Sequence, residues 1–169
     1  MSRIFKFSQL YDPAEDRIAI DTETTAGETQ RLWLTQRMCR GLVEGIAPML
    51  KAASASDAPP EHEAVIQSWE QAAAVAELGK VPPVRPSVET KVGLVREIQL
   101  AASPDGVVAS LDYGGPKAAV LALKTIEARQ FLAMLHTLFS AARWPGDIWP
   151  AWIGAVADGP AAAKAGAIN

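Results

Sequence analysis

Residues Arg17 to Leu34, RIAIDTETTAGETQRLWL, decide the fold. Two segments within them, Arg17–Thr24 and Gln30–Leu34, alternate apolar with polar side chains on either side of the turn-forming residues Thr25–Glu28. An alternation with a period of two indicates a strand with one buried face. The stretch therefore predicts a β-hairpin.

The neighbouring segments extend this hairpin into a larger unit. Arg3–Leu10 also alternates and predicts a preceding strand, so that the three strands form a meander. Thr35 is a plausible N-cap for a helix that follows, and Pro48 is expected to kink or end that helix. The apolar stripe of the helix consists of Cys39, Leu42, Val43, Ile46, Met49 and Leu50.

The same order of patterns recurs later in the chain. Strands are predicted over 95–101, 107–113 and 119–124, and a helix from Thr125 onward. Residues 16–50 and 105–139 match in hydrophobic pattern without a gap, although few identities accompany the match. We predict an α+β fold with two similar β-β-β-α halves. These are antiparallel meanders with helices packed on one face, and a linker helix lies between them.

The expected domain organisation follows from these units. A first half over 1–51 precedes a linker over 52–93, and a second half over 94–143 precedes a Trp- and Pro-rich segment with a flexible tail over 144–169. The linker holds a helix over about 61–80, and the halves together form one compact domain. This helix is expected to pack loosely across one edge of the protein, with candidate contacts at Val65, Ile66, Trp69, Ala73, Val75 and Leu78.

The composition excludes several classes of protein. Lys and Arg number 16 against 19 Asp and Glu, so no overall basic field exists to gather nucleic acid or an anionic membrane. Cys39, His62 and His136 are too few for a closed zinc site, and we expect no metal and no cofactor. The chain shows no signal peptide and no transmembrane segment, which predicts a cytoplasmic protein without membrane contact.

One short string carries a resemblance to an enzyme family. Ile18–Thr25, IAIDTETT, resembles the first motif of the DnaQ-like 3′–5′ exonucleases, in which an apolar strand runs into Asp-x-Glu-Thr. The resemblance implies that Asp21 and Glu23 hold a catalytic metal pair. The two further acidic motifs of the family are missing from this sequence. We therefore expect a protein that is not an enzyme, with an exonuclease relic as the second alternative.

The element order carries a second resemblance. A meander followed by a helix, twice over, is similar in topology to the PC4, Whirly and PUR group of single-strand nucleic-acid binders. In this alternative, the resemblance implies that the ligand lies on a curved sheet face with basic and aromatic side chains, here Arg17, Arg31 and Trp33. Asp21 and Glu23 lie in the same neighbourhood and weaken the match.

The favoured function is non-enzymatic. We expect an assembly or adaptor protein, or an accessory subunit of a larger complex, that acts through contacts with a protein partner or in a homodimer. Val120 and Ala122 are predicted to leave apolar outer positions on the second sheet that need covering. Trp144, Trp149 and Trp152 are the other predicted contact residues, because tryptophan is enriched at binding hot spots. The same tryptophans can instead pack on the core.

Overall fold

The hairpin predicted over residues 17–34 is present in the computed structural model, which describes residues 2–54, 59–79, 82–115 and 117–157. β2 (Arg17–Thr24) pairs antiparallel with β3 (Thr29–Leu34), and β1 (Ser2–Asp12) pairs antiparallel with β2. Ile18, Ile20, Leu32 and Leu34 point to the core and are at most 1% exposed. The predicted meander of the first half is confirmed.

A second meander follows the same plan. β5 (Glu97–Ser103), β6 (Gly106–Asp112) and β7 (Ala119–Lys124) pair antiparallel in sequence order. The tight start of β6 requires glycine, because a Cβ on Gly106 would lie 2.1 Å from the Leu123 carbonyl oxygen. Within the described ranges the fold is α+β, with a four-stranded and a three-stranded sheet.

One strand was not predicted. β4 (Lys91–Leu94) pairs parallel with β3, so residues assigned to the linker extend the first sheet instead. The chain then crosses to the other sheet, where the Arg96 amide donates to the Asp112 carbonyl at 2.7 Å. The strand order is β4-β3-β2-β1-β7-β6-β5.

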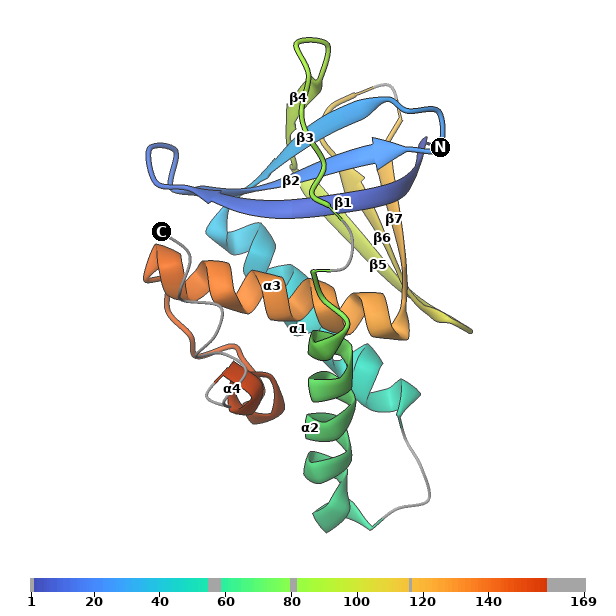
Figure 1. Cartoon of the computed structure of the whole chain (residues 1–169), viewed down its shortest axis with the longest axis vertical. Coiled ribbons are helices and arrows are strands. Elements are labelled where there is room, and N and C mark those ends of the chain that lie inside the picture. Colours follow the sequence, from blue (N-terminus) through green and yellow to red (C-terminus); the bar gives the residue numbers. More distant parts are fainter. Residues whose placement is uncertain (1, 55–58, 80–81, 116, 158–169) are drawn as a thin grey trace.

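Two long helices cover the inner face of the sheets (Figure 1). α1 (Gln36–Ala53) begins at the predicted cap Thr35, whose hydroxyl accepts from the Met38 amide. Pro48 does not end the helix, because α1 continues to Ala53. The alternative that Pro48 kinks the helix stays a prediction. α3 (Thr125–Ala142) begins directly after β7.

The helices pack across the halves. α1 lies mainly on β5 and β6, the strands of the second meander, while α3 contacts β1 of the first meander as well as β6 and β7. The shared core therefore holds side chains from both halves, among them Leu42, Ile46, Phe131 and Leu135. Each half supplies a helix that covers strands of the other.

Two shorter features complete the fold. α2 (Pro60–Ala76) projects away from the sheets in Figure 1, and α4 (Ala151–Ala157) lies near it. The predicted helix over 61–80 is confirmed in position but ends earlier. The expected packing of Val65 and Trp69 was wrong, because these side chains are 45% and 72% exposed. Residues 158–169 of the predicted flexible tail lie outside the described residues.

Candidate protein-binding cleft

The two sheets join over a very short distance and then separate. β1 and β7 pair in parallel only at Ser2 with Ala119 and at Arg3 with Val120. The register between β1 and β2 shifts directly afterwards, between Ile4 and Lys6. A bulge of this kind bends a strand, and Figure 1 shows β1 turning away from β7 near the N-terminus.

The separation opens a cleft of about 930 Å³ between the two strands. Four consecutive residues of β1, 6–9, and four of β7, 121–124, line it. Side chains on one face of a strand come from alternate positions. A cavity that contacts consecutive positions must therefore lie along the edge of the strand. The cleft is therefore bordered by the facing backbone edges of β1 and β7. In the described chain no strand pairs with either edge beyond Arg3 and Val120.

The remaining walls come from α3 and from the segment after α2. Glu127, Gln130 and Met134 face the cleft from α3 at helical spacing. Leu78 and Pro83 approach from the connection between α2 and β4. Apolar and polar side chains line the cleft in similar number. The apolar ones on the strands are Ile4, Phe7, Val107, Val108, Leu121, Ala122 and Leu123, and charged ones include Lys6, Lys124 and Glu127.

Gln9 contributes a polar group to the cleft. Its Nε2 donates to the Phe131 carbonyl of α3 at 3.3 Å. Its Oε1 is buried and has no hydrogen-bond partner among the described residues. An unpartnered buried acceptor is costly to the folded state.

Arg129 of α3 holds α2 in place beside the cleft. The guanidinium is 2% exposed and donates to Gln67 Oε1 at 2.7 Å and to a Glu70 carboxylate oxygen on α2. It also donates to Ser54 Oγ at 3.0 Å and lies 5.1 Å from the centre of the Trp152 ring. Burial lowers the pKa of Arg129, and the Glu70 carboxylate opposes that shift. One side chain thus ties α1, α2, α3 and α4 together.

The hydrogen bonds of Arg129 determine which side of α2 faces α3. Removing the partner of a buried charge costs about 3 to 5 kcal/mol, whereas burying one large apolar side chain yields about 1.5 to 3 kcal/mol. The pairing of Arg129 therefore outweighs the burial of Trp69. The orientation of α2 follows from this balance.

The predicted contact residues of the second sheet lie at and beside the cleft. Ala122 lines it and is partly buried. Val120 is partly exposed on the same strand, at the point where the pairing with β1 ends. On the outer face, Ala122 stands in one row with Val108 and Ala101.

The three predicted contact tryptophans pack against the protein. Trp144 donates to Asp16 at 2.9 Å and meets the Phe139 ring edge-on, with 5.1 Å between the ring centres. Trp149 also meets Phe139 edge-on, at 5.2 Å. Trp152 is 9% exposed beneath Arg129. Each therefore has a packing role.

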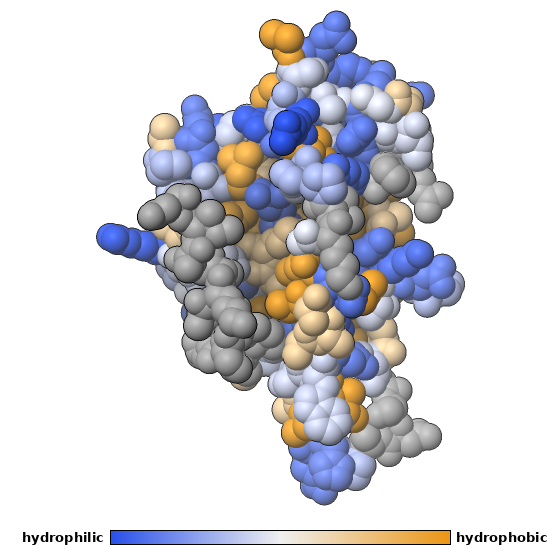
Figure 2. All heavy atoms as spheres, viewed as in Figure 1, coloured by the Kyte–Doolittle hydropathy of each residue, from blue (hydrophilic) through white to orange (hydrophobic). Residues whose placement is uncertain are grey.

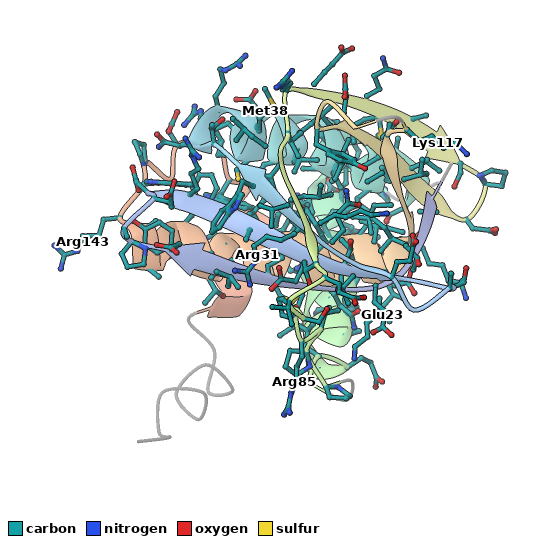
Figure 3. The ribbon with its side chains drawn as sticks, turned by 90° about the horizontal axis from the view of Figure 1, so that it is seen from above. Glu23, Arg31, Met38, Arg85, Lys117 and Arg143 are labelled. Carbon is teal, nitrogen blue, oxygen red and sulfur yellow. The ribbon has the colours of Figure 1, made fainter. Side chains whose placement is uncertain are left out.

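Asp21 and Glu23, the candidate nuclease carboxylates, both lie on β2. Asp21 is 2% exposed, and its two oxygens accept from Arg31 Nε at 2.6 Å and from its terminal nitrogen at 2.8 Å. This pairing leaves little capacity to hold a metal ion. Glu23 lies on the same strand, and Figure 3 shows it well separated from Arg31. The described residues hold no cluster of three or more His, Cys, Asp or Glu side chains suited to a metal.

The candidate nucleic-acid residues already have partners within the protein. Arg31 binds Asp21 and lies 5.6 Å from the centre of the Trp33 ring. Arg17 lies 3.3 Å from a Glu15 carboxylate oxygen. Phosphate binding would have to compete with these carboxylates. The three residues share the outer face of β2 and β3, as predicted from their alternation.

Sequence reasoning missed the cleft and the network beside it. Gln9, Gln130 and Met134 lie next to apolar stripes but belong to elements far apart in the chain. One feature of the sequence could have identified Arg129. It is a charged residue directly beside Ala128, which belongs to the apolar stripe of a predicted helix. A charge in that position predicts a buried partner.

Comparisons with protein-family models, with curated proteins and with solved structures find no match to this chain. Over the described residues, no helix is both long enough and apolar enough to cross a membrane.

Proposed function

We propose that the protein is a non-enzymatic adaptor or accessory subunit that binds an extended segment of a partner protein in the cleft between β1 and β7. One observation carries the proposal: consecutive residues of both strands border the cleft, so two open backbone edges face each other. An added peptide strand pairs with such edges through its main chain.

The lining sets the chemistry of the segment. Apolar side chains such as Phe7 and Leu123 favour apolar residues in the peptide, at alternate positions if it is extended. The open edge of β7 beyond Val120 is about four residues, or about 13 Å, long at roughly 3.3 Å per residue.

Selection from a phage-displayed library of random short peptides tests the proposal. Peptides selected on the native protein are measured against Ala122→Trp, which fills the cleft, and against Ala101→Trp. The second variant adds the same bulk to the exposed outer row of β5, outside the cleft. We expect Ala122→Trp to weaken binding at least about tenfold, or about 1.4 kcal/mol, and Ala101→Trp to leave it unchanged.

A backbone modification separates strand addition from other modes of binding. N-methylation of alternate residues in a selected peptide removes N–H donors and keeps the side chains. We expect either methylation register to weaken binding, because alternate N–H groups of an extended peptide point to opposite sides, one set toward β1 and the other toward β7. Binding of both methylated peptides as tight as that of the unmodified peptide, or equal binding by Ala122→Trp and the native protein, would contradict the proposal. A dimer in light scattering that Ala122→Trp disrupts would show that a second copy occupies the cleft.

A further inference from the structure

The exposed side of α2 is apolar, which is the reverse of an ordinary surface helix. Val65 is 45% exposed and Trp69 is 72% exposed. The outer stripe of α2, as we name this surface, comprises Val65, Trp69, Ala72, Ala73 and Ala76. Orange and pale residues lie along this projecting part of the molecule in Figure 2. A large exposed apolar side chain on a projecting helix indicates a contact surface.

The inner side of the same helix is polar and hydrogen-bonded to α3. Gln67 and Gln71 are 2% and 0% exposed, and Gln71 donates to the Arg129 carbonyl at 3.0 Å. Gln130 of α3 donates to the Ala74 carbonyl at 3.0 Å. Rotation of α2 to bury Trp69 would break these bonds and strip Arg129 of its partners. The outer stripe is therefore held toward the solvent.

The charge of α2 selects among possible occupants. The helix contains Glu61, Glu63 and Glu70 and no Lys or Arg. Glu63 is paired with Lys51 and Glu70 with Arg129, which leaves Glu61 to act on a partner. Glu61 stands one turn before Val65 on the side of the outer stripe. No basic side chain lies in the last turn, so the C-terminal carbonyls add partial negative charge at the other end. Both ends of the outer stripe therefore favour positive charge.

We propose that the outer stripe docks an amphipathic helix of a partner protein, with an apolar stripe flanked by Lys or Arg. Trp69 is the anchor, and the alanines beside it let the partner helix approach closely. A second copy of α2 would bring no Lys or Arg to Glu61, and an anionic membrane would be repelled by this carboxylate. This surface is separate from the cleft and would give an adaptor its second contact.

A pair of designed peptides tests the proposal. One helical peptide of about 17 residues, the length of α2, carries a leucine stripe flanked by lysines, and its twin carries glutamate in place of every lysine. Binding is measured by fluorescence anisotropy with the native full chain, Trp69→Ala, Glu61→Lys and the control Val92→Ala. Val92 is 63% exposed on β4, which lies at the opposite end of the molecule from α2 in Figure 1, and so matches the loss of an exposed apolar side chain.

We expect the lysine peptide to bind, to bind more weakly as salt is raised, and to lose at least about tenfold in affinity with Trp69→Ala. Glu61→Lys should weaken binding less, and Val92→Ala should have no effect. Unchanged thermal unfolding of Trp69→Ala confirms that the variant is folded. Equal affinity of Trp69→Ala and the native chain would overturn the proposal, as would equal binding of the glutamate twin. A dimer lost in Trp69→Ala, or binding to vesicles of anionic lipid, would overturn it too. Ala122→Trp should leave this binding intact, so failure here is distinguishable from failure of the cleft.

Discussion

The two halves of the molecule share their local structure and differ in what surrounds it. α1 and α3 both have 18 residues and begin 89 positions apart, at Gln36 and Thr125. The hairpins agree at the same spacing, since the pair Ile18 and Leu34 corresponds to Val107 and Leu123. This agreement in local structure supports the predicted structural repeat.

The surroundings give equivalent arginines different roles. Arg40 of α1 binds Asp147 through two hydrogen bonds of 2.8 Å at the surface, where the side chain of Asp147 is 64% exposed. Arg129, 89 positions later, is buried and ties α2 to α3. The same residue at the same place in a helix is thus a surface contact in one half and a central link in the other.

The strand edges differ in the same way. β2 and β3 are covered on both sides, by β1 and β4. One edge of β7 pairs with β6, and the other edge pairs with β1 only as far as Val120. The capacity to accept a further strand therefore lies beside the second half, because the two halves are joined through so short a pairing.

The largest expected effect comes from separating the halves. Residues 1–54 and 94–157, produced as individual chains, should each fail to show cooperative unfolding in urea, because α1 packs mainly on β5 and β6 and α3 contacts β1. Circular dichroism during urea titration measures this. A cooperative transition in either isolated half would show that the repeat units are independent.

Deleting the carboxylate partner of each arginine gives the next effect. Glu70→Ala leaves Arg129 buried and uncompensated and should lower the free energy of unfolding by about 3 kcal/mol. The matched variant Asp147→Ala leaves Arg40 in contact with solvent and should have a much smaller effect. Urea denaturation compares the two. Equal losses would refute the different roles assigned to the two arginines.

The reactivity of the Cys39 thiol tests whether the apolar stripe of α1 is buried. Cys39 stands where α3 has Ala128, both are 0% exposed, and burial raises the pKa of the Cys39 thiol to about 12. The thiol should therefore stay protonated and unreactive toward iodoacetamide at pH 8 in the native protein, and react fully in denaturant. Mass spectrometry counts the modified chains. Rapid native labelling would place Cys39 outside the core.

The smallest expected effect is a dependence on acid pH. Hydrogen bonds from Arg40 hold the pKa of Asp147 at about 2, below the ordinary value of 3.8. Because the folded pKa is depressed, the contribution to stability is present above about pH 4 and is lost as the pH falls toward 2. NMR titration should place the Asp147 midpoint near 2 in the native protein and higher in Arg40→Met. Identical midpoints would rule out the Arg40 pairing in solution.

The sequence predicted the elements whose side chains alternate or recur with a clear period. The hairpin over 17–34 and the two long helices were predictable because local pattern and burial agree there. β4 was not, because all four of its residues are exposed or only partly buried and its order depends on pairing with β3. Its residues KVGL alternate Val92 and Leu94 with Lys91 and Gly93, but four residues are too few for this pattern to distinguish a strand.

The candidate surfaces depend on contacts between distant parts of the chain. The orientation of α2 follows from Arg129, which lies 59 positions after Glu70. The cleft follows from a register shift between Ile4 and Lys6 that no local pattern marks. Ala122 was predicted as a contact residue because an apolar outer position needs covering, and the structure places it in the lining of the cleft.

Hydrogen–deuterium exchange with and without a selected peptide tests the central claim most directly, since it reports which backbone amides the peptide covers. We predict slower exchange in the bound state at residues 6–9 of β1 and 121–124 of β7, the two edges of the cleft. Protection confined to the outer edge of β5 or to α2, with exchange unchanged in both cleft strands, would contradict the account.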